Sequence, residues 1–92
     1  MVTLKDIAFA HDRIREFIHR TPILTNKSLN ELAGAELFFK CDNFQKAGSF
    51  KIRGATNTVE LLSQDEMDNG IATTSSGNHG AALSMAVTRR GG

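Results

Sequence analysis

The sequence has one cysteine, one proline, no tryptophan and no tyrosine among its 92 residues. A single cysteine, Cys41, cannot form an intrachain disulfide or a cysteine-rich metal cage, which excludes a disulfide-stapled secreted scaffold and predicts a cytoplasmic setting. No apolar run reaches the length of a signal peptide or a membrane span, so we expect no membrane contact. His11 and His19 have no carboxylate partner at metal-ligand spacing, and we therefore expect no metal site.

The sequence also lacks a large excess of positive or negative residues. Eleven Lys and Arg residues face ten Asp and Glu residues, for a formal net charge of +1, which lacks the basic surface typical of nucleic-acid binding. Six phenylalanines are the only aromatic residues, and they do not alternate with basic residues as single-strand binders require. With 40% hydrophobic residues, the composition is that of an ordinary globular protein.

The first half of the chain predicts two helices and a strand. Apolar residues at helical spacing follow a capping Thr3 and predict a helix to about His19, which Thr21-Pro22 then ends. A capping-box pattern at residues 28–31 predicts a short helix that ends at Gly34. The alternating segment 36–41 is typical of a strand.

The second half repeats a strand, glycine turn and helix pattern. Ser49 is a suitable N-cap for a helix over about residues 50–62, and a capping box at residues 63–66 predicts a short helix that Gly70 ends. Residues 71–74 predict a buried strand, and a tight loop at 75–80 leads into a helix over 81–90. This alternation favours an α/β fold with an open parallel sheet, and because a strand would normally follow residue 90, we expect a longer protein.

The loop from Ser75 to Gly80 has two interpretations that the residues alone leave open. Its glycines let the backbone approach a ligand, and its N–H groups and hydroxyls suit an anion at a helix N-terminus. The other interpretation is an ordinary helix start with serine and asparagine caps. The spacing matches neither a P-loop nor a dinucleotide-binding fingerprint.

Lys51 is unusual for its position at the start of a predicted helix, where the macrodipole disfavours a cation. A lysine there is most often simply exposed to solvent. However, Phe50 can exclude water and Arg53 adds a positive charge, and both effects favour the neutral amine that forms a Schiff base with a carbonyl. His79 is either a capping or packed residue or a base, and we expect Cys41 at its strand end to be a small buried side chain.

Two motifs, Gly48-Ser49-Phe50-Lys51-Ile52-Arg53-Gly54-Ala55 and Ser75-Ser76-Gly77-Asn78-His79-Gly80, resemble those of the fold-type II pyridoxal-phosphate enzymes. Within that family they are similar to the serine racemases and serine/threonine dehydratases, and the resemblance runs from the first helix to Arg90. It implies the α/β fold of the tryptophan synthase β-like group. Residues 1–70 would begin the large cofactor-binding domain and 71–92 the smaller domain, with the remainder of both outside this sequence.

The resemblance also implies roles for single residues. Lys51 would link to the aldehyde of pyridoxal 5'-phosphate and move the substrate α-proton, and Ser76 would act as second acid/base on the opposite face. Phe50 would pack against the cofactor ring and Asn78 would hydrogen-bond its hydroxyl. Substrate-carboxylate binding would fall to Ser75, Ser76, Asn78 and His79.

The function implied is dehydration or racemisation of a small serine- or threonine-type amino acid by a full-length homodimer. The family's phosphate-binding glycine loop and divalent-cation carboxylates lie outside these residues, and Ala47 replaces a threonine near the nucleotide effector site of the animal racemases. Two alternatives remain: a β-replacement enzyme similar to cysteine synthase, and a non-catalytic chain or partner-binding module whose unfinished sheet drives association.

Overall fold

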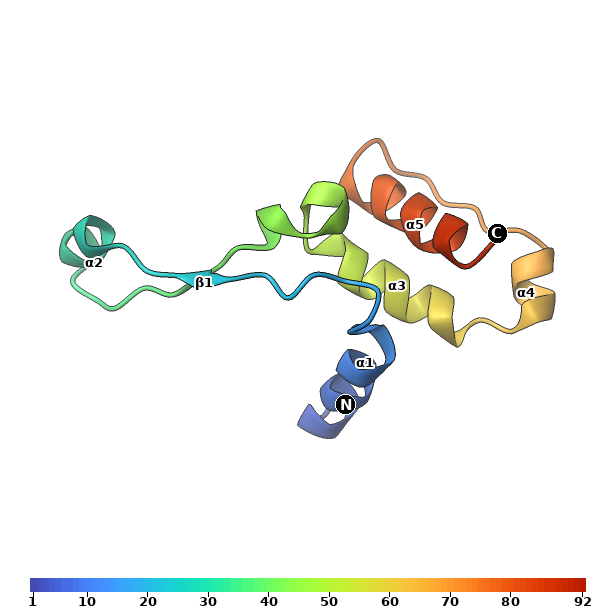
Figure 1. The fold of residues 1–92 in the computed structure, drawn as a ribbon, viewed down its shortest axis with the longest axis horizontal. Helices are drawn as coiled ribbons and strands as arrows, with labels where there is room; N and C mark the ends of the chain where they lie inside the picture. Colours follow the sequence, from blue (N-terminus) through green and yellow to red (C-terminus); the bar gives the residue numbers. More distant parts are fainter.

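A computed structural model describes all residues from 1 to 92 (Figure 1). Helices α3, α4 and α5 form the packed part of the molecule, while α1 and a long arm that carries α2 project away from it. The elements in chain order are α1 (Leu4–Ile14), β1 (Ile23–Leu24), α2 (Lys27–Ala33), β2 (Phe39–Lys40), η1 (Asp42–Phe44), η2 (Lys46–Gly48), α3 (Lys51–Leu61), α4 (Gln64–Asp68) and α5 (Asn78–Arg89).

Helix α1 ends at Ile14, five residues before the predicted end at His19. Its start is as predicted, because Thr3 and Asp6 form a reciprocal capping box. The chain leaves the helix early because Phe17 and Ile18 pack against the rest of the molecule: Phe17 lies under the Arg89 guanidinium, and Ile18 contacts the buried core. The predicted apolar face of α1 is therefore buried only at its end, where Ile14 is covered.

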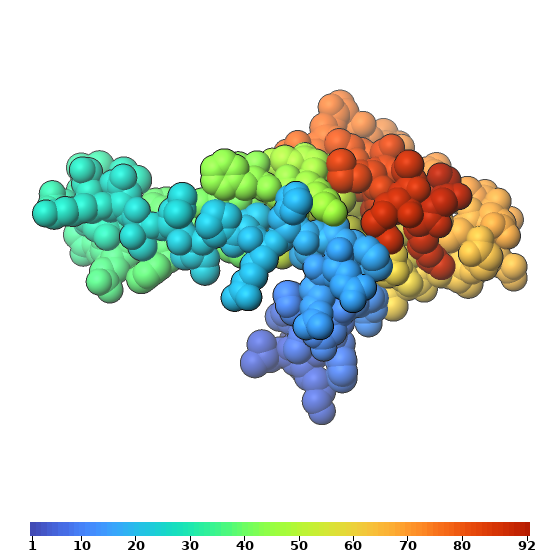
Figure 2. Space-filling model, viewed as in Figure 1, coloured from blue at the N-terminus to red at the C-terminus, as the bar shows by residue number.

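The arm spans residues 20–41 and protrudes from the molecule in the space-filling view (Figure 2). Strands β1 and β2 pair antiparallel, with Ile23 opposite Lys40, and together they are the whole sheet. The strand predicted at residues 36–41 is therefore only two residues long. Helix α2 is capped by Asn26, whose side chain accepts a hydrogen bond from Leu29 N at 2.9 Å, rather than by the predicted Ser28. Its C-cap is Gly34, as predicted.

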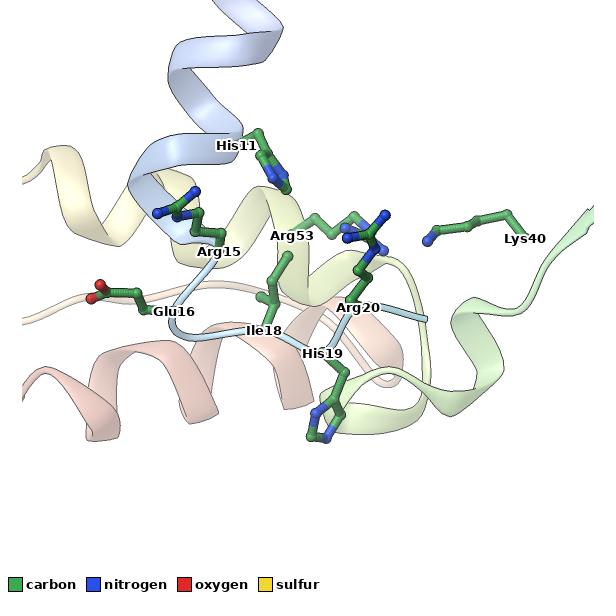
Figure 3. A pocket seen from close by; sticks show the side chains of 8 residues that line it. All are labelled: His11, Arg15, Glu16, Ile18, His19, Arg20, Lys40 and Arg53. Carbon is green, nitrogen blue, oxygen red and sulfur yellow. The ribbon is translucent and has the colours of Figure 1, made fainter. Parts of the chain in front are cut away.

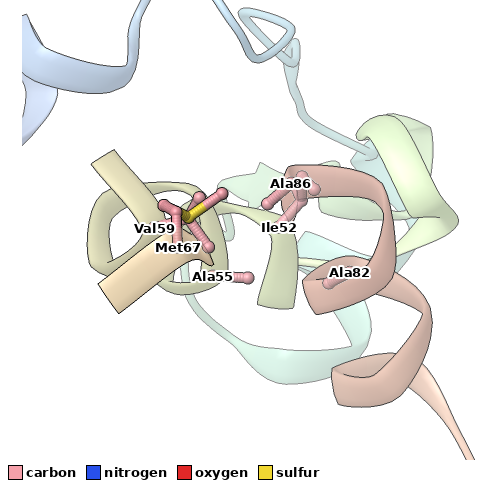
Figure 4. Close-up of a cluster of buried hydrophobic side chains, with 6 residues drawn as sticks. All are labelled: Ile52, Ala55, Val59, Met67, Ala82 and Ala86. Carbon is pink, nitrogen blue, oxygen red and sulfur yellow. The ribbon is translucent and has the colours of Figure 1, made fainter. Parts of the chain in front are cut away.

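The buried core lies between α3 and α5, with α4 closing one side (Figure 4). Alanines on both helices let the two backbones approach closely, and the larger side chains of α3 fill the space that remains. The two helices run in the same direction, so their N-terminal ends lie at the same end of the pair (Figure 1). The buried apolar residues of this core are Ile52, Ala55, Val59, Met67, Ala82 and Ala86.

Arginine side chains fasten the opposite, C-terminal end of the helix pair. Arg90 donates to the carbonyl oxygens of Val59 and Leu62 at the end of α3, with the second bond at 2.8 Å. Arg89 pairs with Glu60 and stacks on the Phe17 ring, 3.7 Å from its centroid. These contacts fix the position of α5 along the axis of α3, and thereby set the relative position of the N-termini of the two helices.

The strand predicted at residues 71–74 does not form. From Ile71 to Ser76 no backbone group takes part in a hydrogen bond, and all but Ile71 are exposed. A strand needs a neighbouring strand to complete its ladder, and this segment lies beside helix α5, with no other strand to pair with it. The predicted parallel sheet is accordingly not seen here, where the only sheet is the antiparallel pair in the arm.

None of the helices is both long and apolar enough to cross a lipid bilayer.

Candidate functional site

The turn that leads into α3 is held in an unusual backbone conformation. Ala47 has φ 61° and Gly48 has φ 75°, so two consecutive residues lie in the left-handed region. Glycine tolerates this conformation, whereas alanine is strained in it by about 1–2 kcal/mol. The turn reverses the chain so that Ser49, Phe50 and Lys51 follow directly at the helix start.

Gln45 anchors the start of this turn to the segment after α1. Its side-chain oxygen accepts from His19 N at 2.8 Å and from Lys46 N at 2.9 Å, and its side-chain nitrogen donates to His19 O at 2.8 Å. Gln45 is only 4% exposed, and every polar atom of its amide that is buried has a partner. The sequence did not point to Gln45, because a glutamine whose side-chain amide bonds to the backbone N–H and C=O of a distant residue belongs to no recognisable sequence motif.

Helix α3 begins one residue later than its predicted cap implies. Phe50 occupies the cap position without a side-chain bond, and Ser49 Oγ lies 3.4 Å from Lys51 N as its acceptor. The buried Ser49 thus still contacts the first turn of the helix.

The Lys51 side chain is exposed, and its Nζ makes no hydrogen bond and no ion pair. Its neighbour is the Phe50 ring, whose centroid lies 5.2 Å from Nζ. Phe50 is itself 61% exposed, so the expected exclusion of water from Lys51 is not achieved by these residues. What the structure does provide is an unpaired amine at a helix start with an aromatic face beside it.

The second loop closes on itself before α5 begins. Ser75 Oγ accepts from Gly77 N at 3.2 Å, and the helix starts at Asn78 rather than at the predicted residue 81. Gly80 lies so close to Ser75 that an added Cβ would be 3.2 Å from its carbonyl oxygen. A side chain at this position would therefore crowd the Ser75 backbone, which would have to shift by a few tenths of an ångström.

One cavity brings part of the two loops together. It has a volume of about 700 Å³, and Phe50, Lys51 and His79 line its wall. Ser75, Ser76 and Asn78 are exposed and do not line it. The remaining wall comes from α3, α4, the 71–73 segment and α5: Arg53, Gly54, Ala55, Thr58, Leu62, Glu66, Ile71, Ala72, Thr73 and Leu83.

Arg53, one turn into α3, is held by a carboxylate. Its Nε and terminal nitrogen donate to Asp42 at 2.8 and 2.9 Å, and Thr21 Oγ1 donates to the same carboxylate at 2.6 Å. Hydrogen bonding from Arg53 lowers the pKa of Asp42 to about 2, and the carboxylate in turn raises the pKa of Arg53. The network ties the arm's base to α3 beside Lys51. Sequence reasoning recognised Arg53 only as a nearby charge and missed Asp42.

No group of three or more His, Cys, Asp or Glu side chains gathers in a way that could hold a metal ion. Cys41 is half-buried, and its thiol donates to Phe39 O at 3.3 Å.

The chain matches the family model described as pyridoxal-phosphate dependent enzyme over residues 14–92. It is similar to a serine racemase of Dictyostelium discoideum, with 61% identity over 85 residues, which is 92% of this chain and 26% of that protein. It is also similar to a beta-hydroxyaspartate dehydratase of Paracoccus denitrificans, with 55% identity over 97% of this chain and 28% of that protein.

Solved structures agree with these sequence matches. The Dictyostelium discoideum serine racemase superposes with a TM-score of 0.92 at 60% identity, covering 97% of this chain and 29% of that one. A threonine deaminase from T.th. superposes with a TM-score of 0.82 at 35% identity, covering 98% of this chain and 32% of that one. The chain thus spans about a quarter to a third of the length of the relatives that it matches.

Proposed function

The chain belongs to the pyridoxal-phosphate-dependent enzyme family with the fold-type II architecture, and from this premise we propose that it carries the lysine-bearing half of a dehydratase or racemase site. The observation that carries the proposal is the unpaired Lys51 amine, which shares a cavity with the start of α5. The substrate would be a small amino acid of the serine or threonine type, since the relatives include a serine racemase and a threonine deaminase.

The residues present fit pyridoxal phosphate. A cavity of about 700 Å³ lies within the range of small-molecule sites, and it offers an accessible amine with an aromatic side chain next to it. When bound, the cofactor supplies an electron sink for negative charge at the substrate α-carbon. Lys51 would hold it covalently, Phe50 would pack on its ring, and Asn78 would hydrogen-bond the ring hydroxyl.

Proton movement would be the work of side chains from both loops. Lys51 Nζ would take the α-proton on one face of the substrate, and Ser76 Oγ would carry the proton on the other face, as racemisation requires. Ser75, Asn78 and His79 would bind the substrate carboxylate near the positive end of α5. Elimination of a hydroxyl needs only the Lys51 side, so the ratio of racemised to dehydrated product in a Ser76→Ala enzyme tests the role of Ser76.

The larger organisation follows the same proposal. Residues 1–70 would form the beginning of the large domain and 71–92 the beginning of the small domain, in a cytoplasmic homodimer. A divalent cation would be bound only by residues outside this chain. A partner-binding role is the second candidate, favoured by the unpaired backbone from Ile71 to Ser76 and by the exposed apolar side chains of the arm.

Covalent trapping tests the assignment of Lys51. The protein is incubated with pyridoxal phosphate, reduced with borohydride and digested, and the modified peptides are identified by mass spectrometry. We expect the label on Lys51 in preference to Lys5, Lys27, Lys40 and Lys46, because Lys51 alone combines an unpaired amine, a place in a cavity wall and an aromatic ring beside it.

A Lys51→Arg variant is the matched control, since it keeps the charge and cannot form the linkage. Labelling spread evenly over the five lysines, or unchanged in this variant, would refute the proposal. Dehydratase or racemase activity without labelling of Lys51 would refute it as well.

A further inference from the structure

A second cavity lies on the other side of α3, between the end of α1, the base of the arm and Arg53. It has a volume of about 590 Å³, large enough for a small molecule. Seven of the eight residues that line it are charged residues or histidines (Figure 3): His11, Arg15, Glu16, Ile18, His19, Arg20, Lys40 and Arg53. We call it the cationic cavity.

Three permanent cations and one imidazole turn toward the same region of this cavity. Arg20, Lys40 and Arg53 extend toward one another, and the His11 ring points at them from the end of α1, whereas Arg15, Glu16 and His19 point outward (Figure 3). The only carboxylate that neutralises this group is Asp42, which pairs with Arg53. The three converging cations therefore exceed the one carboxylate that pairs with them by two charges, since Glu16, the acidic residue in the cavity wall, points away from them (Figure 3).

Donor capacity in the cavity is unused. Arg20 makes no side-chain hydrogen bond or ion pair, and neither does the His11 ring, while Lys40 Nζ donates once, to Thr21 O at 2.7 Å. Gathering like charges without a counter-charge costs electrostatic energy that an anion would remove. Guanidinium groups match phosphate oxygens with two parallel bonds, and a phosphate group carries close to two negative charges at neutral pH.

We propose that the cationic cavity binds a phosphate-bearing small molecule, held by Arg20, Lys40 and His11 with Arg53 behind them. Lys51 and Phe50 do not line it, so it is separate from the cofactor cavity, although Arg53 lines both. The proposal does not depend on the function assigned to Lys51. A ligand here would contact the same turn of α3 that presents Lys51.

Inorganic pyrophosphate serves as the probe, with affinity measured by isothermal titration calorimetry at low ionic strength, where surface attraction is screened least. We expect saturable one-to-one binding that Arg20→Ala weakens about tenfold or more, since the variant loses a charge-assisted bidentate contact. Arg20→Lys, which keeps the charge and loses the fork, should weaken binding to an intermediate extent. Arg20 is exposed and unpaired, so the fold should tolerate both changes.

Two control variants test whether pyrophosphate binds in the cationic cavity rather than elsewhere on the protein. Lys5→Ala removes an exposed cation outside the cavity and should leave the affinity unchanged, as should Lys51→Ala, which removes the amine of the other cavity. Equal weakening by Arg20→Ala and Lys5→Ala would show attraction by net charge alone and overturn the proposal. Loss of binding in Lys51→Ala would place the anion in the cofactor cavity, and absence of saturable binding in the unaltered protein would also overturn the proposal.

Discussion

Lys51 and Arg53 lie two residues apart on α3, yet their surroundings are opposite. Arg53 is half-buried and bound to Asp42 by two hydrogen bonds, whereas the Lys51 amine has only an aromatic ring nearby. The difference follows from the geometry of a helix, in which residues two positions apart face different directions. Arg53 thus faces the base of the arm and serves as an anchor, while Lys51 faces outward and is left available for chemistry.

Asp42 is the residue whose ionisation should influence stability most clearly. Its pKa of about 2 lies below the ordinary value near 3.9, so its ionised form stabilises the folded state above about pH 4. That contribution should decline as the pH falls from about 5 toward 2, through the unfolded and then the folded pKa. Asp42→Asn should lower the free energy of unfolding by about 1–2 kcal/mol at pH 7, since a partly exposed ion pair is screened.

Urea denaturation of both proteins between pH 7 and pH 2.5 measures this difference. We expect the gap between them to shrink toward the acid end. Asp12→Asn is the matched control, because Asp12 is exposed and its carboxylate has no hydrogen bond or ion pair. A gap that stays constant with pH would contradict the role of the Asp42 carboxylate.

At the scale of elements, the turn before α3 and the interior of α3 each contain a glycine, and the backbone conformations of these two glycines differ. Gly48 has φ 75°, whereas Gly54 lies inside the helix, and an added Cβ would meet no atom within 4 Å at either position. An alanine would therefore meet no steric clash with neighbouring atoms at either position, and the two substitutions differ only in the backbone conformation of the substituted residue.

Alanine substitutions at the two glycines should change stability in opposite directions. Gly48→Ala should destabilise the fold by about 1–2 kcal/mol, because it forces an L-residue into the left-handed region. Gly54→Ala should stabilise it by about 0.5–1 kcal/mol through helix propensity. Thermal or urea unfolding of the pair measures both effects, and each variant is the control for the other. A stabilising Gly48→Ala would show that the turn is not held as described.

Helix boundaries show where local sequence determines an element and where it does not. The capping box at Ser63 and Glu66 and the glycine stop at Gly34 were predicted correctly, because each depends on residues three or four apart. The end of α1 was predicted too late, since contacts of Phe17 and Ile18 with distant residues overrode the helical pattern. The strand at 71–74 was predicted from its composition, but a strand exists only if it has a neighbour.

The whole molecule is more extended than a compact chain of its size. Its radius of gyration is 16.2 Å, against about 12 Å for a compact domain of this length. Its accessible surface is 6809 Å², against about 5,200 Å² for a compact protein of 10.0 kDa. The excess comes from α1 and the arm, where apolar side chains such as Ile23, Leu32 and Phe38 are exposed.

Stability should therefore differ strongly between the parts of the molecule. Hydrogen exchange followed by mass spectrometry should show weak protection in α2 and the β1–β2 pair, which have no buried residue, and strong protection in the middle of α3 and α5. The segment from Ile52 to Val59, whose core-facing side chains are buried, provides the internal reference. Equal protection in the arm and in α3 would mean that the arm packs against other polypeptide, for example in a second copy of the chain.

The sequence by itself determined which segments are helical, the caps at Thr3 and Ser63, the glycine end of α2 and the family. Each of these depends on residues that are close together in the chain or on a short motif. Only the tertiary structure decided that α3 and α5 run side by side in the same direction, that Lys51 and His79 share a cavity, and that Asp42 holds Arg53. It also left Ser75, Ser76 and Asn78 outside that cavity and brought Arg20, Lys40 and His11 together in another. These arrangements depend on contacts between residues far apart in the chain, and no local periodicity specifies such contacts.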